Sequence, residues 1–87
     1  METPQKFKKK PIVIEAIQYI GENMGVVSSF IGDFPHKCYP TEKLIVITTL
    51  EGEHLVREGD YVIKGAYEEF YPCKPDIFKG TYDVFES

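Results

Sequence analysis

The chain has 87 residues, of which 43% are hydrophobic and 28% charged, and its formal net charge is −4. This composition is that of one small globular domain, and it excludes a disordered tail, a coiled coil and a collagen-like fibre. No apolar run approaches the roughly 18 residues that cross a bilayer, so we expect no membrane association. No secretory signal is recognisable, so we expect a cytoplasmic protein.

Charge is distributed unevenly along the chain. Residues 1–10 contain four lysines and one glutamate and carry +3, which leaves −7 for residues 11–87 out of the total of −4. We predict a single domain over residues 1–87 in which residues 1–10 form a basic lead-in. The acidic remainder disfavours nucleic acid, because phosphate binding depends on clustered lysine and arginine. A basic arm over an aromatic sheet stays open as an alternative that would bind nucleic acid weakly.

The cysteines and histidines do not form a metal-binding pattern. Cys38 and Cys73 belong to no CxxC motif, and His36 and His54 do not complete a zinc spacing. The His36-x-Cys38 pair would share one face of a strand. We therefore predict no metal, no cofactor and two free thiols in a reducing compartment, with a Cys38–Cys73 disulfide as the alternative.

The first half of the chain predicts a strand, a helix and a loop. Residues 12–20 are rich in β-branched residues and apolar on both faces, which indicates a strand covered on both sides for part of its length or a strand that contains a bulge. Apolar residues at helical spacing over residues 24–31 predict a short helix, with Asn23 as its N-cap and Gly32 as its stop. The two prolines of residues 33–43 predict a loop.

The second half of the chain predicts short strands separated by turns. Residues 44–50 are the strongest strand, and Gly52 marks the hairpin turn that follows. Further strands are expected at 53–56, 61–64, 70–71 and 81–85, with one helical turn at 75–78 closed by Gly80.

These elements predict an α+β fold. Because turns rather than crossover helices separate the strands, the pairing should be antiparallel. We expect a small, twisted sheet or half-open barrel of five to six strands with one short helix, since curling reduces the number of exposed edges.

No catalytic constellation is recognisable, so we predict that the chain is not an enzyme and has no catalytic residue. Cys73 stands between Pro72 and Lys74, and Lys74 could lower the thiol pKa. A Cys73 nucleophile with His36 or His54 as its base is therefore the enzyme alternative. The simpler interpretation is that Cys73 fills a tight turn bounded by proline.

A binding site is better supported than a catalytic one. Aromatic side chains mixed with a few cations can hold a planar or anionic ligand by stacking and charge. Asp60 is one of the candidate ligand-binding residues, although a carboxylate in a Gly-Asp turn commonly accepts hydrogen bonds from the amides of its own turn. The candidate ligand-binding residues are Arg57, Asp60, Tyr61, Lys64, Tyr67, Tyr71 and Lys74.

Two segments of the C-terminal half carry a family resemblance. Glu58-Gly59-Asp60-Tyr61-Val62-Ile63-Lys64-Gly65 and Phe70-Tyr71-Pro72-Cys73-Lys74-Pro75-Asp76-Ile77-Phe78 resemble a group of small phage and prophage proteins of unknown function. Those proteins carry a Pro-Gly-Asp-Tyr-Gly-like turn, and this chain has Glu58 where they often have proline. Residues 8–16 and 81–82 also resemble the group, so the likeness covers most of the chain.

The resemblance implies an origin rather than an activity. It implies an accessory protein made in the cytoplasm of an infected or lysogenic bacterium. We therefore predict a non-enzymatic binding protein that interferes with a host process or defence by binding a host protein or a small ligand. Alternatives are the Cys/His enzyme, the weak nucleic-acid binder and a virion component. Self-association through free sheet edges is also expected.

Overall fold

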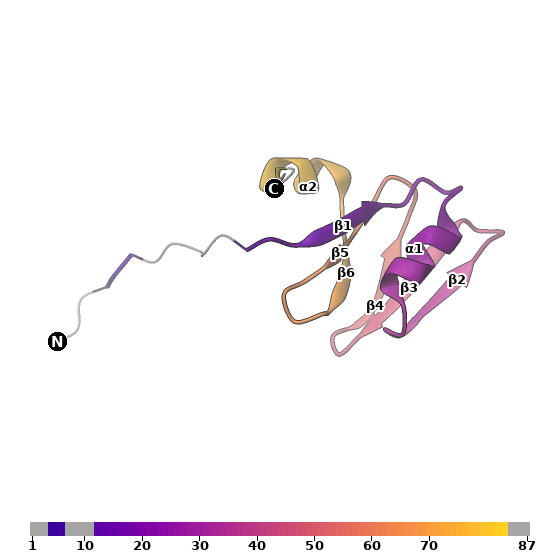
Figure 1. Ribbon diagram of the computed structural model, residues 1–87, viewed down its shortest axis with the longest axis horizontal. Coiled ribbons are helices and arrows are strands. Elements are labelled where there is room, and N and C mark those ends of the chain that lie inside the picture. The colour runs from indigo at the N-terminus through magenta and orange to yellow at the C-terminus, as the bar shows by residue number, and fades with distance from the viewer. Residues whose placement is uncertain (1–3, 7–11, 84–87) are drawn as a thin grey trace.

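Two three-stranded antiparallel sheets and two helices make up the part of the chain that the structure describes, a computed structural model covering residues 4–6 and 12–83 (Figure 1). The first sheet has the order β1-β5-β6, and the second has the order β2-β3-β4. The strands are β1 (Glu15–Gln18), β2 (His36–Tyr39), β3 (Leu44–Thr49), β4 (Gly52–Val56), β5 (Tyr61–Lys64) and β6 (Phe70–Cys73); the helices are α1 (Met24–Ile31) and α2 (Pro75–Thr81).

The small antiparallel α+β fold is confirmed, but its finer form differs from the prediction. The strands form two separate sheets rather than one curled sheet or half-open barrel, and there are two helices in the described chain rather than one. Every strand pair in these sheets is antiparallel. Short turns between successive strands favour this arrangement, because antiparallel neighbours need no crossover helix.

One hydrophobic core joins the two sheets and α1. Its members come from every layer, so burial of apolar surface is what holds the sheets together. The buried core residues are Tyr19, Val27, Ile31, Ile45, Ile47, Val56, Val62 and Phe70. Figure 1 shows α1 lying over the second sheet and α2 beside the first.

Helix α1 has the predicted bounds and Asn23 at its N-cap position, but the capping bond from the Asn23 side chain is missing. The Asn23 side chain makes no capping bond to the helix. Its Oδ1 accepts the Ile20 N–H at 2.9 Å, and its Nδ2 donates to the Gln18 carbonyl at 2.8 Å. Asn23 therefore fastens the helix to the end of β1. Gly32 ends the helix as expected, with φ +66° and its N–H bonded to the Ser28 carbonyl.

The predicted loop over residues 33–43 is wrong in its middle part, which is strand β2. Its sequence, His-Lys-Cys-Tyr, has no strand-like apolar pattern, and pairing with the apolar strand β3 is what orders it. His36 and Cys38 are half-buried while Lys37 and Tyr39 are exposed, so the first two share a face as predicted. His36 also bonds to Ser28 of α1 at 2.8 Å.

The final strand predicted over residues 81–85 is also wrong where the structure describes it. Helix α2 continues through Gly80 to Thr81, whose hydroxyl donates to the Ile77 carbonyl at 2.8 Å. Pro75 begins the helix at a position where its missing N–H costs nothing. Residues 82–83 follow without strand pairing, and residues 84–85 lie outside the described residues.

Candidate functional site

The first sheet has one face toward the core and one outer face. Ala16, Ile63 and Tyr71 stand opposite one another in register on neighbouring strands, so their side chains share a face. Val62 and Phe70 alternate with them along the strands and belong to the core. The face that carries Ala16, Ile63 and Tyr71 is therefore the outer one.

Three aromatic rings meet on this outer face. The Phe78 ring of α2 stacks on the Tyr61 ring of β5, with centroids 3.9 Å apart and planes 8° from parallel. The Tyr82 ring contacts Phe78 at 5.1 Å between centroids. Burial raises the pKa of Tyr71, and the neighbouring Tyr82 raises it further. These rings fix α2 against the sheet and present a preformed aromatic surface.

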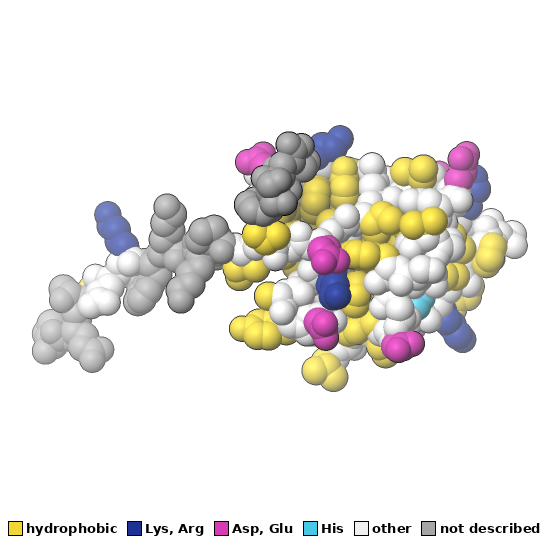
Figure 2. Space-filling view, in the orientation of Figure 1, with side chains coloured by type: hydrophobic (Ala, Val, Ile, Leu, Met, Phe, Trp, Pro, Cys, Tyr) yellow, Lys and Arg dark blue, Asp and Glu magenta, His cyan; other side chains and the backbone are white. Residues whose placement is uncertain are grey.

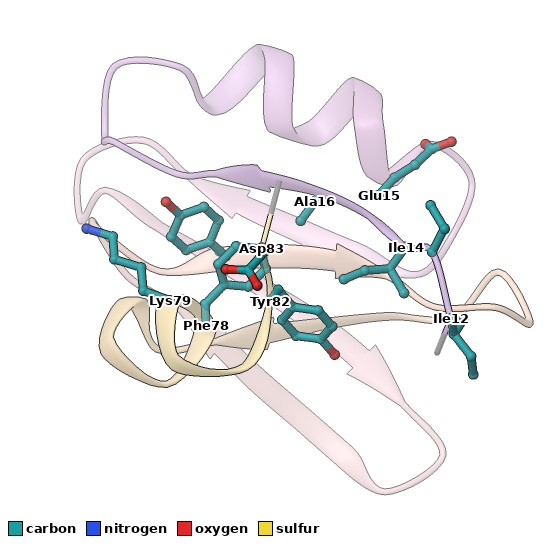
Figure 3. Close-up of a pocket in the computed structure, with 10 residues that line it drawn as sticks. Ile12, Ile14, Glu15, Ala16, Phe78, Lys79, Tyr82 and Asp83 are labelled. Carbon is teal, nitrogen blue, oxygen red and sulfur yellow. The ribbon is translucent and has the colours of Figure 1, made fainter. Parts of the chain in front are cut away.

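An open groove runs between the chain around β1 and α2. Its volume is about 920 Å³. Ile12, Ile14 and Ala16 line one side, and Phe78 and Tyr82 line the other. In Figure 3, Ile14 points toward the aromatic side of the groove, whereas the Glu15 carboxylate points away. The groove is therefore mainly apolar in its lining.

Exposed apolar side chains lie beside the groove. Figure 2 shows hydrophobic side chains at the surface in the area of β1 and α2. Ile12 is 52% exposed, Val13 is 66% exposed and Ile77 is also exposed. Apolar side chains gathered at the surface around a groove are typical of an interaction site.

Asp60, which is not among the residues that line the groove, has a structural role. Its side chain is buried, and its Oδ2 accepts the Arg57 N–H at 2.9 Å. Lys74 Nζ lies 3.3 Å and 3.4 Å from its two carboxylate oxygens. The Asp60 carbonyl also accepts the Tyr19 N–H at 2.8 Å. The carboxylate therefore joins the β4–β5 turn to the junction of β6 with α2, and the backbone carbonyl of the same residue binds the end of β1.

The seven residues predicted as one ligand site fall into separate places. Tyr61 lines the groove, and Tyr71 lies on the same outer face. Arg57, Asp60 and Lys74 form the structural cluster described above. Lys64 and Tyr67 lie at the opposite end of β5, where Lys64 approaches Glu68 at 4.0 Å and Tyr67 is 92% exposed.

Sequence reasoning missed several residues of the groove. Tyr82 was expected in a strand and Phe78 in a helical turn, while Ile12 and Ile14 were expected in a strand covered on both faces. Lys79 was not singled out, although it also lines the groove. One feature of the sequence could have indicated the groove. Residues 12–20 carry apolar side chains on both faces, and one short strand cannot bury all of them.

The thiol and the histidines are arranged unlike a nucleophile and its base. Burial raises the pKa of Cys73, and Asp60 and Asp76 raise it further, in the direction opposite to the predicted effect of Lys74. Lys74 instead pairs with Asp60. His54 bonds to Thr49 at 3.1 Å, and no hydrogen bond within residues 12–83 joins a histidine to a sulfur.

Both cysteines are free thiols. In the described ranges, no group of three or more His, Cys, Asp or Glu side chains is placed to hold a metal ion. Neither α1 nor α2 has the length and apolar character that a membrane-spanning helix requires.

A second, smaller pocket lies between the β3–β4 hairpin and β6. Its volume is about 480 Å³, and its lining includes Phe34, Leu50, His54 and Tyr71. Leu50 is fully exposed at the hairpin tip. This pocket provides a second surface against which the role of the groove can be tested.

Comparison of the chain with protein-family models, with curated proteins and with solved structures gives no significant match. The resemblance to small phage proteins stays a prediction from the residues that carry it.

Proposed function

We propose that this chain is a non-enzymatic binding protein that recognises a protein partner through the groove between residues 12–16 and α2. The observation that carries the proposal is the combination of an open, mainly apolar groove with the preformed Tyr61–Phe78 stack. A groove of about 920 Å³ lies within the range of pockets that hold ligands in proteins.

The chemistry of the groove favours an apolar or aromatic side chain from the partner. Tyr82 offers a half-buried ring that can contact such a side chain, and Ile14 lies across from it. Because Phe78 is already held against Tyr61, little side-chain entropy is lost when the partner binds.

The partner in this proposal is a host protein in the bacterial cytoplasm. The resemblance of residues 58–65 and 70–78 to small phage proteins supports this choice. Binding alone is then sufficient for interference with a host process, because occupying a surface of the host protein excludes its normal partner.

A matched pair of tyrosine substitutions tests the groove. We expect Tyr82→Ala to weaken partner binding at least tenfold, because an aromatic residue in an interface core commonly contributes more than about 1.4 kcal/mol. Tyr67→Ala removes an exposed tyrosine outside the groove and should leave the affinity unchanged. The measurement is affinity capture from bacterial lysate with mass spectrometry, followed by calorimetry with the purified partner.

Equal affinities of the two variants for the recovered partner would contradict the proposal. Recovery of a metabolite without any protein would favour a small-ligand function instead. Circular dichroism of both variants checks that each retains the fold.

A further inference from the structure

The free edge of β1 is less protected than the sheet edges formed by β6 and β2 in the described chain. Natural proteins guard exposed edges with proline, charge or covering elements. Strand β6 contains Pro72 and β2 exposes Lys37. Residues 12–20, by contrast, contain no proline or lysine, and Glu15 is their one charged residue.

The alternation of hydrogen bonds shows which groups of β1 face this edge. The Tyr19 N–H points toward the β5 side, where it donates to the Asp60 carbonyl at 2.8 Å. Because successive residues of a strand point their backbone groups to opposite sides, those of Ile14, Ala16 and Gln18 point to the free edge. The Gln18 carbonyl already accepts a bond from Asn23. The backbone N–H and C=O groups of Ile14 and Ala16 can therefore form hydrogen bonds with another strand.

Residues 12–14 extend beyond the strand that pairs with β1. The register with β5 begins at Glu15 opposite Lys64, so residues 12–14 have no strand partner in this sheet. The side chains of Ile12 and Val13 are 52% and 66% exposed. A strand added on the outer edge would supply hydrogen bonds to this segment and cover its apolar side chains.

The segment is self-complementary in one antiparallel register. With Ile14 opposite Ile14 of a second copy, Ile12 faces Ala16 and Val13 faces Glu15. On the groove face the two Ile14 side chains then meet at the axis and each Ile12 opposes the small Ala16, and no like charges are opposed. A two-fold axis at Glu15 would set two carboxylates opposite each other. An axis at Val13 would set Pro11 opposite Glu15, and an axis at Ala16 would require Gln18, whose carbonyl is occupied.

Charge also favours a second copy of this chain as the source of the strand that pairs with the free edge of β1. Residues 1–10 carry +3 and residues 11–87 carry −7. Antiparallel pairing through residues 12–16 brings the basic N-terminal portion of each chain toward the acidic domain of the other. Opposite charges that meet in this way assist association and fix its orientation.

We infer that two copies of this chain form a two-fold symmetric dimer by antiparallel pairing of residues 12–16, with Ile14 at the axis. The pairing makes one continuous six-stranded sheet from the two first sheets. Ile12 and Ile14 line the groove in one copy. The same residues of the partner copy join the same face, so the second copy extends the wall of the groove. This inference does not depend on the proposed function.

Disulfide cross-linking tests the register directly. Residues in a hydrogen-bonded antiparallel pair have Cα atoms about 5.5 Å apart, which a disulfide can span. In a background with Cys38→Ala and Cys73→Ala, we expect Ile14→Cys to form a covalent dimer under mild oxidation. Glu15→Cys is the control, because Glu15 faces Val13 rather than its own equivalent, and its cross-linking should be at least tenfold slower.

Light scattering of the unmodified chain gives the second readout. We expect a species of twice the chain mass, which Ile14→Lys converts to a monomer and Leu50→Lys, at the exposed hairpin tip, does not. Circular dichroism checks that both lysine variants are folded. A monomer at millimolar concentration, a higher oligomer, or cross-linking of Glu15→Cys as fast as that of Ile14→Cys would overturn the inference. If the chain dimerises as expected but Tyr82→Ala and Tyr67→Ala bind the partner equally well, the dimer inference is supported and only the proposed function is refuted.

Discussion

Replacing Asp60 with alanine is expected to lower the free energy of unfolding by about 2–3 kcal/mol, the cost of leaving a buried polar group unsatisfied together with the loss of a charge-assisted contact. Asp60 is 3% exposed, and its carboxylate accepts the Arg57 N–H. Alanine would leave that N–H without its acceptor in a partly buried turn. It would also release Lys74, whose side chain is largely exposed and can return to water.

Urea denaturation measures this loss in the free energy of unfolding, and two further variants serve as comparisons. Asp60→Asn keeps an oxygen for the Arg57 N–H and should lose about 1 kcal/mol, because the ion pair with Lys74 alone is removed. Asp33→Ala changes an exposed aspartate and should stay within about 0.5 kcal/mol of the unmodified chain. Equal stabilities of Asp60→Ala and Asp33→Ala would show that the carboxylate does not hold the turn.

Replacing Ile47 with alanine is expected to lower the free energy of unfolding by about 3 kcal/mol. Ile47 is fully buried in β3, the central strand of the second sheet, and belongs to the core that joins both sheets and α1. Its truncation removes buried apolar surface and leaves a cavity that a close-packed core fills only in part. For a domain of this size, the loss is a large share of the total stability.

The matched control for Ile47 is Leu50, three residues along the chain. Leu50 is fully exposed, so Leu50→Ala should change the free energy of unfolding by less than about 0.5 kcal/mol. Thermal and urea denaturation of the two variants provide the comparison. Similar losses in both would mean that the two sheets do not share the core described above.

The elements predicted correctly are those in which local pattern and tertiary role agree. Strand β5 has the predicted bounds, Tyr61–Lys64, and α1 has the predicted bounds, Met24–Ile31. In α1, apolar residues at helical spacing coincide with the buried positions Val27 and Ile31. Gly32 supplies the positive φ that the end of this helix needs. Where local conformational preference and tertiary packing agree in this way, an element is predictable from sequence.

The elements predicted wrongly depend on contacts between distant residues. Strand β2 is polar and is ordered by pairing with β3, so its own sequence gives little sign of it. Thr81 was expected at the start of a strand over residues 81–85. The stacking of Phe78 on Tyr61, 17 positions earlier in the chain, instead favours the helix. Tertiary packing overrides local propensity at both places.

In the candidate site, too, features set by neighbouring residues were predictable and features set by distant residues were not. That Asp60 would bond to an amide of its own turn was predictable, because the spacing to Arg57 is local. The pairing of Asp60 with Lys74 was not predictable, since the two residues are 14 positions apart in the chain. The groove depends on the relative positions of residues 12–16 and α2, which only the folded sheet defines.

The most direct test of groove binding is a ¹⁵N NMR titration of the labelled protein with the partner recovered by affinity capture. The account predicts the largest shift changes at Ala16, Tyr61, Phe78 and Tyr82, which line the groove. Changes confined to the hairpin pocket around Leu50 and His54, or no recoverable partner under conditions that preserve the fold, would contradict it.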